Sequence, residues 1–208
     1  LRLADIPIVS EEDVASQSSD RPTEYWLVDP IDGTASFASG YDGFVCQAAW
    51  MRDGHPWLAS VYAPALDRVY LAERGMGATM NGRPIAVRPV DMRQLTLVDN
   101  YPEPRGVAKR LFRDLHFSKY LESGSIGLKI CLVADGAADV FVKDVTVKDW
   151  DIAAPHLVLQ EAGGVLTQFT GQTFEYRAGY EKNGLVATSS VPLFRKVSDV
   201  VSTYGRDT

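Results

Sequence analysis

Carboxylates and oxygen-rich groups gather in a short motif, Asp-Pro-Ile-Asp-Gly-Thr at residues 29–34, whose chemistry suits a metal site. The motif follows the apolar run Trp26–Val28, so a buried strand would carry Asp29 to its end. Asp29 and Asp32 stand three positions apart across a turn. They can converge on a hard cation, with the Ile31 carbonyl as a further oxygen ligand.

The end of the same motif could bind an anion. The hydroxyl of Thr34 and the amides of Gly33 and Thr34 could face a phosphate group. A plainer interpretation is also open, because Asp-Pro and Asp-Gly are frequent turn dipeptides whose side chains bond their own backbone. The motif alone does not decide between the two.

Three further segments carry polar side chains that could belong to a functional site or could have only a structural role. Glu11-Glu12-Asp13 follows a short apolar strand, Asp149-Trp150-Asp151 precedes a predicted helix at 152–162, and Ser123-Gly124-Ser125 opens an earlier predicted helix. The structural alternative is a solvated acidic loop for the first segment and capping of free backbone amides for the other two.

The composition limits the class of protein and of partner. The chain has 208 residues, of which 46% are hydrophobic, and a formal net charge of −6, which together describe an ordinary globular protein. Apolar runs of only a few residues exclude a membrane-spanning segment. The acidic balance argues against a nucleic acid polymer as partner, so a bound phosphate would need positive charge from another source.

Cysteine and histidine usage suggests no zinc site or disulfide. Cys46 and Cys131 lie 85 positions apart without metal-site spacing, and we expect buried thiols in a reducing cytoplasm. His55, His116 and His156 show no zinc-like spacing, so structural roles are expected.

The pattern of elements changes midway along the chain. Short apolar runs separated by Gly, Asn and Pro turns predict an antiparallel meander in the first part. After about residue 94, helices and strands alternate, which indicates a layered α/β region. The predicted strands are 25–28, 44–51, 58–62, 69–71 and 85–88, followed by helix 125–134, strand 139–142, helix 151–162, strands 165–169 and 185–188, and helix 191–204.

Taken in order, these motifs resemble the inositol monophosphatase superfamily, a group of magnesium-dependent, lithium-sensitive phosphomonoesterases. The resemblance rests on Glu11-Glu12, on residues 29–34 and on Trp150-Asp151-Ile152-Ala153-Ala154. It extends through Glu73–Ala78 with Asn81-Gly82, and through Glu161–Gly164. Each motif is modest alone, but the ordered set covers most of the chain.

The resemblance implies a set of metal ligands. These would be the side chains of Glu11, Asp29, Asp32 and Asp151, with the Ile31 carbonyl as another ligand. Four carboxylates and a phosphate monoester of about two negative charges would repel each other strongly. Two or three Mg²⁺ ions would bring the sum close to neutral.

The resemblance also implies the reaction, which is in-line attack of a metal-activated water on a small phosphate monoester. Glu11 and Thr34 would orient and activate that water. Asp32, Gly33 and Thr34 would hold the phosphate, and Asp144 falls near a substrate-contacting acid of the inositol enzymes. No covalent phosphoenzyme is needed.

The implied fold is a layered αβαβα sandwich with an antiparallel first sheet and a mixed second sheet. Residues 1–93 would form the part that carries most metal ligands, and residues 94–208 the part that carries the Trp-Asp helix. Family members have an amino-terminal helical pair that we expect this sequence to omit, which would uncover one sheet face. A homodimer is implied by the resemblance only.

The sequence leaves two alternatives open. Haloacid-dehalogenase-like phosphatases present Asp-x-Asp-Gly-Thr with the first Asp as nucleophile, but here the spacing is one residue longer. A catalytically weak family member could act as a binding or regulatory protein. Pro155 stands where the family pattern usually has Gly, and Ala35-Ser36-Phe37 replaces the commoner Thr-Asn-Phe type of sequence.

The sequence is compatible with two classes of substrate, a nucleotide bisphosphate and an inositol monophosphate. Ser10–Asp13 and the segment Ser123–Ala134 look closer to the 3′-phosphoadenosine 5′-phosphate phosphatase branch, but the Lys-Glu-Phe expected there after Asp-Gly-Thr is absent. An inositol monophosphate therefore stays in consideration. Lys143 could contact a second phosphate, although a solvated lysine is the simpler expectation.

Overall fold

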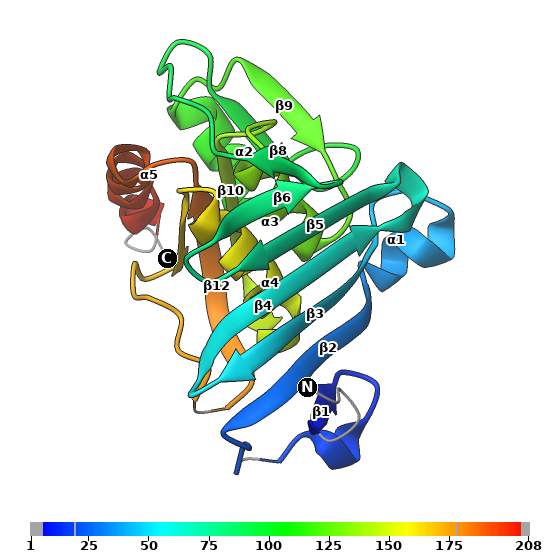
Figure 1. The fold of residues 1–208 in the computed structure, drawn as a ribbon. Helices are drawn as coiled ribbons and strands as arrows, with labels where there is room; N and C mark the ends of the chain where they lie inside the picture. Colours follow the sequence, from blue (N-terminus) through cyan, green and yellow to red (C-terminus); the bar gives the residue numbers. More distant parts are fainter. Residues whose placement is uncertain (1–5, 19, 178, 205–208) are drawn as a thin grey trace.

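The computed structural model describes residues 6–18, 20–177 and 179–204, which form two β-sheets with helices packed between and beside them (Figure 1). The first sheet has seven strands in sequence order, and every neighbouring pair is antiparallel except β1 and β2, which are parallel. Its strands are β1 (Ile8–Ser10), β2 (Glu24–Asp32), β3 (Val45–Arg52), β4 (His55–Ala63), β5 (Arg68–Glu73), β6 (Gly77–Met80) and β7 (Arg83–Ile85).

The second sheet is mixed and has the order β11-β12-β10-β8-β9. Its central strand β10 pairs antiparallel with β12 and parallel with β8, and β8 pairs parallel with β9. The strands are β8 (Thr96–Asp99), β9 (Lys119–Glu122), β10 (Val140–Lys148), β11 (Val165–Gln168) and β12 (Glu181–Thr188).

The helices complete the layers. α3 (Ile126–Ala134) and α4 (Asp149–Glu161) share one buried core with the inner face of the first sheet. α2 (Gly106–Asp114) and α5 (Val191–Tyr204) cover the other face of the second sheet through a second core cluster. The short helix α1 (Thr34–Ser39) follows β2, and single 3₁₀ turns span Val14–Ser16 and Pro64–Leu66.

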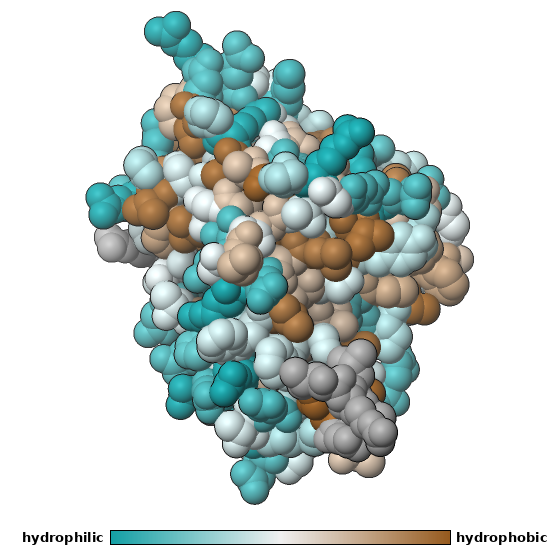
Figure 2. Space-filling view, viewed as in Figure 1, coloured by the Kyte–Doolittle hydropathy of each residue, from teal (hydrophilic) through white to brown (hydrophobic). Residues whose placement is uncertain are grey.

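The predicted α/β sandwich is confirmed, with a mostly antiparallel first sheet and a mixed second sheet. In the described part of the chain the layers run sheet, helices, sheet, helices. No helix among these residues covers the outer face of the first sheet, where the apolar residues Trp26, Leu58, Leu71 and Met76 line a surface hollow. Figure 2 shows hydrophobic side chains on this side of the molecule.

Several local predictions need correction. The strand predicted at 85–88 belongs to β7 only at Ile85, because Arg88 leaves the first sheet to pair with Asp139 of the second half. The strands β6, β8 and β9 and the helix α2 were not predicted. Cys131 is buried as expected, but Cys46 is exposed because it points to the outer face of β3.

No helix of the described ranges is both long enough and apolar enough to cross a membrane.

Candidate active site

An irregularity in β2 brings both aspartates of the 29–34 motif to the inner face of the sheet. Tyr25, Leu27 and Asp29 alternate inward along β2, and Asp29 is only 1% exposed. In a regular strand, residues three apart would face opposite sides. Here the pairing with β3 shifts between Asp29 and Asp32, which inserts one extra residue and turns the Asp32 side chain inward as well.

The two oxygens of Asp29 have different surroundings. Oδ1 accepts a hydrogen bond of 3.0 Å from the Ile31 N–H, so the turn interpretation is right for that atom. Oδ2 is buried and has no hydrogen-bond partner. A buried carboxylate oxygen without a partner is costly, and a cation bound there would compensate it.

Asp32 is held by the start of α3. Its Oδ2 accepts a hydrogen bond of 2.6 Å from the Gly127 N–H, in the first turn of that helix. Ser125 caps the helix as predicted, since its hydroxyl oxygen accepts from the Leu128 N–H at 2.8 Å. Asp32 therefore lies beside Asp29 with one oxygen already bonded to the protein.

Glu11 and Asp151 reach the same place from distant segments. β1 runs parallel to β2, and the Glu11 N–H donates to the Val28 carbonyl at 3.2 Å, which places Glu11 next to Asp29. Asp151 lies in the first turn of α4, where its Oδ2 accepts from the Lys148 N–H at 2.7 Å. Glu11, Asp29 and Asp151 each offer one carboxylate oxygen, and the three oxygens lie within 4.8 Å of one another.

The electrostatic consequence is a cluster of acids that holds protons readily. Burial, reinforced by the charges of Asp32, Glu11 and Asp151, raises the pKa of Asp29 to about 9. Burial also raises the pKa of Asp151 to about 7, with Asp32 and Glu11 adding to the effect. The pKa of Asp32 is raised by burial too, although the Gly127 hydrogen bond and Lys129 oppose the shift.

These residues fit a hard divalent cation. The donors are carboxylate oxygens, which Mg²⁺ prefers, and one oxygen from each of the three side chains lies within 4.8 Å of the other two. The partnerless Asp29 Oδ2 is the donor that the protein itself leaves unused. Three of the four predicted ligand side chains thus meet in one group, and Asp32 adjoins it.

The phosphate-binding residues of the motif lie at the same edge. Gly33 has a φ of 89°, and a Cβ there would stand 3.0 Å from the Ser125 Cβ, so glycine is required for the close approach of this loop to α3. The Thr34 hydroxyl donates a hydrogen bond to the Ile31 carbonyl at 3.2 Å. The carbonyl oxygen that was predicted as a metal ligand therefore already accepts one hydrogen bond.

Comparison with known proteins decides the family. The sequence model of the "Inositol monophosphatase family" matches residues 2–200. The chain belongs to the inositol monophosphatase family. By this membership it is a phosphoric monoester hydrolase, and the haloacid-dehalogenase-like alternative is wrong, in agreement with the mostly antiparallel first sheet.

Relatives of this family member carry several different names. The chain is 35% identical over 181 residues to the 3′(2′),5′-bisphosphate nucleotidase CysQ of Salmonella typhimurium, covering 83% of this chain and 70% of that one. It is 30% identical over 190 residues to the Nus factor SuhB of Vibrio cholerae, covering 88% and 68%. A solved IMPase of Thermotoga maritima matches with a TM-score of 0.83 and 26% identity, covering 98% and 77%.

Two predicted substrate contacts lie outside the acid cluster of this inositol monophosphatase family member. Asp144 is exposed on β10, and its Oδ1 lies 3.4 Å from where a Cβ of Gly106 would be, at the start of α2. Lys143 is not a solvated lysine, because its Nζ pairs with the fully buried carboxylate of Asp99 at 3.2 Å.

A cavity of about 300 Å³ borders α1, the helix that starts at Thr34. Its walls include the Tyr41 and Tyr101 rings, stacked with centroids 4.6 Å apart, and Arg105. Sequence reasoning missed these three residues, because only folding brings them together. The remaining lining residues are Ala35, Ser36, Ser39, Asn100, Ser123 and Gly124.

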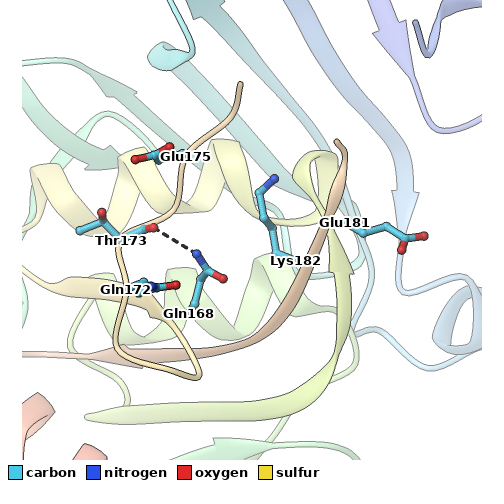
Figure 3. A pocket seen from close by; sticks show the side chains of 6 residues that line it. All are labelled: Gln168, Gln172, Thr173, Glu175, Glu181 and Lys182. Atoms are coloured by element: carbon cyan, nitrogen blue, oxygen red, sulfur yellow. Dashed lines mark hydrogen bonds between the residues drawn. The ribbon is translucent and has the colours of Figure 1, made fainter. Parts of the chain in front are cut away.

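A second cavity, of about 530 Å³, lies beside the β11–β12 hairpin and contains none of the predicted site residues (Figure 3). Its lining is polar, and Gln168 donates from its side-chain amide to the Thr173 carbonyl at 3.2 Å. Lys182 points away from that bond and forms an ion pair with Asp149. The larger cavity is therefore separate from the acid cluster.

Proposed function

We propose that the protein hydrolyses a small phosphate monoester in a Mg²⁺-dependent reaction at the cluster formed by Glu11, Asp29 and Asp151. The observation that carries the proposal is their convergence. Carboxylates from three distant segments offer oxygens within 4.8 Å of one another, and one buried oxygen of Asp29 has no partner. A fold that needed these acids only for structure would pair them with its own cations.

The proposed ligands are Glu11, Asp29, Asp32, Asp151 and the Ile31 carbonyl, and the acidity of the group suits two or three Mg²⁺ ions. When bound, Mg²⁺ would offset the negative charge of the site and of the ester, and would lower the pKa of a coordinated water. The carboxylates need to lose their protons for this, so proton release accompanies metal binding.

Individual side chains would then guide attack on phosphorus. The Thr34 hydroxyl donates its hydrogen to the Ile31 carbonyl, so its lone pairs remain to accept a hydrogen bond from the attacking water. Glu11 is exposed and can take that water's proton. The backbone of Gly33 and Thr34, with Asp32 behind it, would orient the phosphate for in-line displacement.

The cavity next to α1 supports a nucleotide as substrate over an inositol phosphate. Its tyrosine pair offers an aromatic wall for a planar base, and the Arg105 guanidinium suits a second phosphate. The 35% identity to a bisphosphate nucleotidase points the same way. We therefore propose 3′-phosphoadenosine 5′-phosphate as the favoured ester, with inositol monophosphate as the alternative.

Phosphate release from both esters, measured with Mg²⁺ and with a chelator, tests the proposal. We expect turnover of the nucleotide that requires Mg²⁺ and exceeds turnover of inositol 1-phosphate. Equal turnover with and without the metal would overturn the metal-dependent reaction, and a preference for inositol 1-phosphate would overturn the substrate assignment alone.

A binding or regulatory role is the second candidate function. It is favoured by Pro155 within α4 and by the similarity to proteins named as Nus factors. The same assay separates the two, because a scaffold would bind Mg²⁺ without releasing phosphate. Lithium sensitivity, a homodimer and a cytoplasmic location accompany the main proposal through the family resemblance, and the two free thiols agree with a reducing compartment.

A further inference from the structure

Gln47 on β3 contacts the turn of α4 that carries Asp151. It is only 3% exposed and is the cross-strand pair partner of Asp29. Its Nε2 donates to the Trp150 carbonyl at 3.0 Å and to the Asp151 carbonyl at 3.1 Å. The two carbonyl acceptors fix which end of the amide faces the helix.

The Asp151 carbonyl needs such a donor because of Pro155. In an α-helix, the carbonyl of residue i accepts from the N–H of residue i+4. The residue four positions after Asp151 is Pro155, which lies inside the continuous helix Asp149–Glu161 and has no N–H. The Gln47 side chain thus occupies the donor position that the proline leaves empty.

We propose that Gln47 is a positioning residue for the metal site. Its amide replaces the missing Pro155 N–H and ties the first turn of α4 to the strand pair that carries Asp29. The separation of the Asp29 and Asp151 carboxylates then depends on this side chain. The inference rests on the proposed role of Asp151 as a metal ligand.

Gly127 provides the space for this arrangement. A Cβ at position 127 would lie 2.5 Å from Gln47 Oε1 and 3.1 Å from Asp32 Oδ2, which is too close for the first contact. The same residue donates its N–H to Asp32. Pro155 in α4, Gln47 on β3 and Gly127 in α3 are therefore structurally interdependent, and all three lie near the acid cluster.

A double-mutant cycle of Gln47→Met and Pro155→Ala tests the proposal. Methionine keeps the length of the side chain but cannot donate, and alanine restores a backbone N–H to α4. Titration calorimetry with Mg²⁺ alone should show at least about tenfold weaker binding for Gln47→Met, the size typical of lost support to a metal ligand. Pro155→Ala should stay within about twofold of the wild type, and the double variant should recover to within about threefold. Cys46→Ser, on the opposite face of β3, is the matched control and should bind like the wild type.

Amide hydrogen exchange in the metal-free protein provides a readout that does not depend on metal binding or activity. Exchange across residues 149–155 should become faster in Gln47→Met and slow again in the double variant. Unchanged exchange in Gln47→Met overturns the proposal, as does a double variant that binds Mg²⁺ as weakly as Gln47→Met. A wild-type protein that does not bind Mg²⁺ would instead overturn the proposed function, which the exchange data distinguish from failure of the Gln47 contact.

Discussion

Two aspartates lie two positions apart at the start of α4, the buried Asp149 and the half-buried Asp151, and their carboxylates have different partners. Asp149 has a fully buried side chain that pairs with Arg21 at 2.6 Å and with Lys182 at 3.2 Å. The Arg21 guanidinium also lies over the Tyr180 ring, 3.9 Å from its centroid. Asp151 lies near the acids Glu11, Asp29 and Asp32, and its carboxylate accepts a hydrogen bond from the Lys148 N–H.

Asp149 therefore has a structural role, whereas the position of Asp151 suits a metal ligand. Burial raises the pKa of Asp149, but Lys182 and Arg21 oppose the shift, so the protein supplies the counter-charge itself. At Asp151 burial again raises the pKa, the Lys148 N–H and charge oppose the shift, and the neighbouring acids Asp32 and Glu11 add to it. The chain can therefore fold around Asp149 unaided, whereas the cluster around Asp151 gains from an external cation.

Removal of one charge from the cluster should have the largest effect. In Asp29→Asn, we expect Mg²⁺-dependent phosphate release to fall on the order of a thousandfold, because a ligand and its charge are both lost. The metal-free variant should unfold at a higher temperature than the wild type, because burial and the neighbouring acids oppose ionisation of Asp29 in the folded state, and Asn removes that cost. Steady-state kinetics and thermal unfolding measure both. Glu12→Gln, an exposed neighbour of Glu11, is the control, and an Asp29→Asn enzyme with more than a tenth of normal activity would contradict the ligand role.

Removal of a counter-charge from Asp149 should lower stability and leave Mg²⁺ binding nearly unchanged. Arg21→Met leaves the buried carboxylate with Lys182 alone, and we expect the free energy of unfolding to drop by about 3 kcal/mol, the lower end for a broken buried pair. Mg²⁺ affinity of the folded protein should change less than about threefold. Urea unfolding and calorimetry measure the two quantities. A variant that keeps its stability but loses Mg²⁺ binding would remove the distinction between the two aspartates.

Sequence patterns located the acids of the cluster but not the contacts that position them. The 29–34 motif and the Trp-Asp motif have fixed local spacing, so they could be identified directly. The bulge that turns Asp32 inward arises from pairing with β3, and no local pattern reveals it. Helix capping was the structural alternative for residues 149–151. Asp151 does accept the Lys148 N–H, whereas Asp149 forms a core ion pair with Arg21, 128 positions away.

The long elements could likewise be predicted better than the short ones. α5 spans Val191–Tyr204 as expected, and α4, predicted at 151–162, spans Asp149–Glu161. β8 is four residues long and buried at every position, so it lacks the alternation that marks a half-exposed strand. Gln47 carried no local signal either, because its importance comes from Pro155, far along the chain.

The pH dependence of stability offers a smaller test. The folded pKa values of Asp29 and Asp151, about 9 and about 7, both exceed the ordinary value of 3.8, so the folded state holds extra protons at neutral pH. The metal-free protein should therefore lose stability as pH rises. His156, with a pKa lowered by burial to about 4 from 6.5, has the opposite effect only below pH 6.5. Lys129, with a pKa lowered by burial to about 8, opposes the trend only above that pH.

The useful window is thus pH 6.5 to 8, set by the pKa values of His156 and Lys129. Urea unfolding with a chelator present should show a decrease of about 1–2 kcal/mol across it, as expected for about one proton. Asp29→Asn should show a flatter profile. A wild-type stability that rises with pH in this window would mean that the acids of the cluster are not coupled as the structure indicates.

The smallest effect is expected at Asp144, an exposed acid outside the cluster. If it accepts a hydrogen bond from a substrate hydroxyl, Asp144→Ala should raise KM by roughly 2–5-fold and leave kcat unchanged, because an exposed polar contact contributes little free energy. Asp199→Asn, an exposed change on α5, is the control. A large fall in kcat would place Asp144 among the reacting groups, and an unchanged KM would remove it from the substrate site. The first result would add Asp144 to the acids that take part in the reaction, and the second would leave it as an acid that only lies near the site.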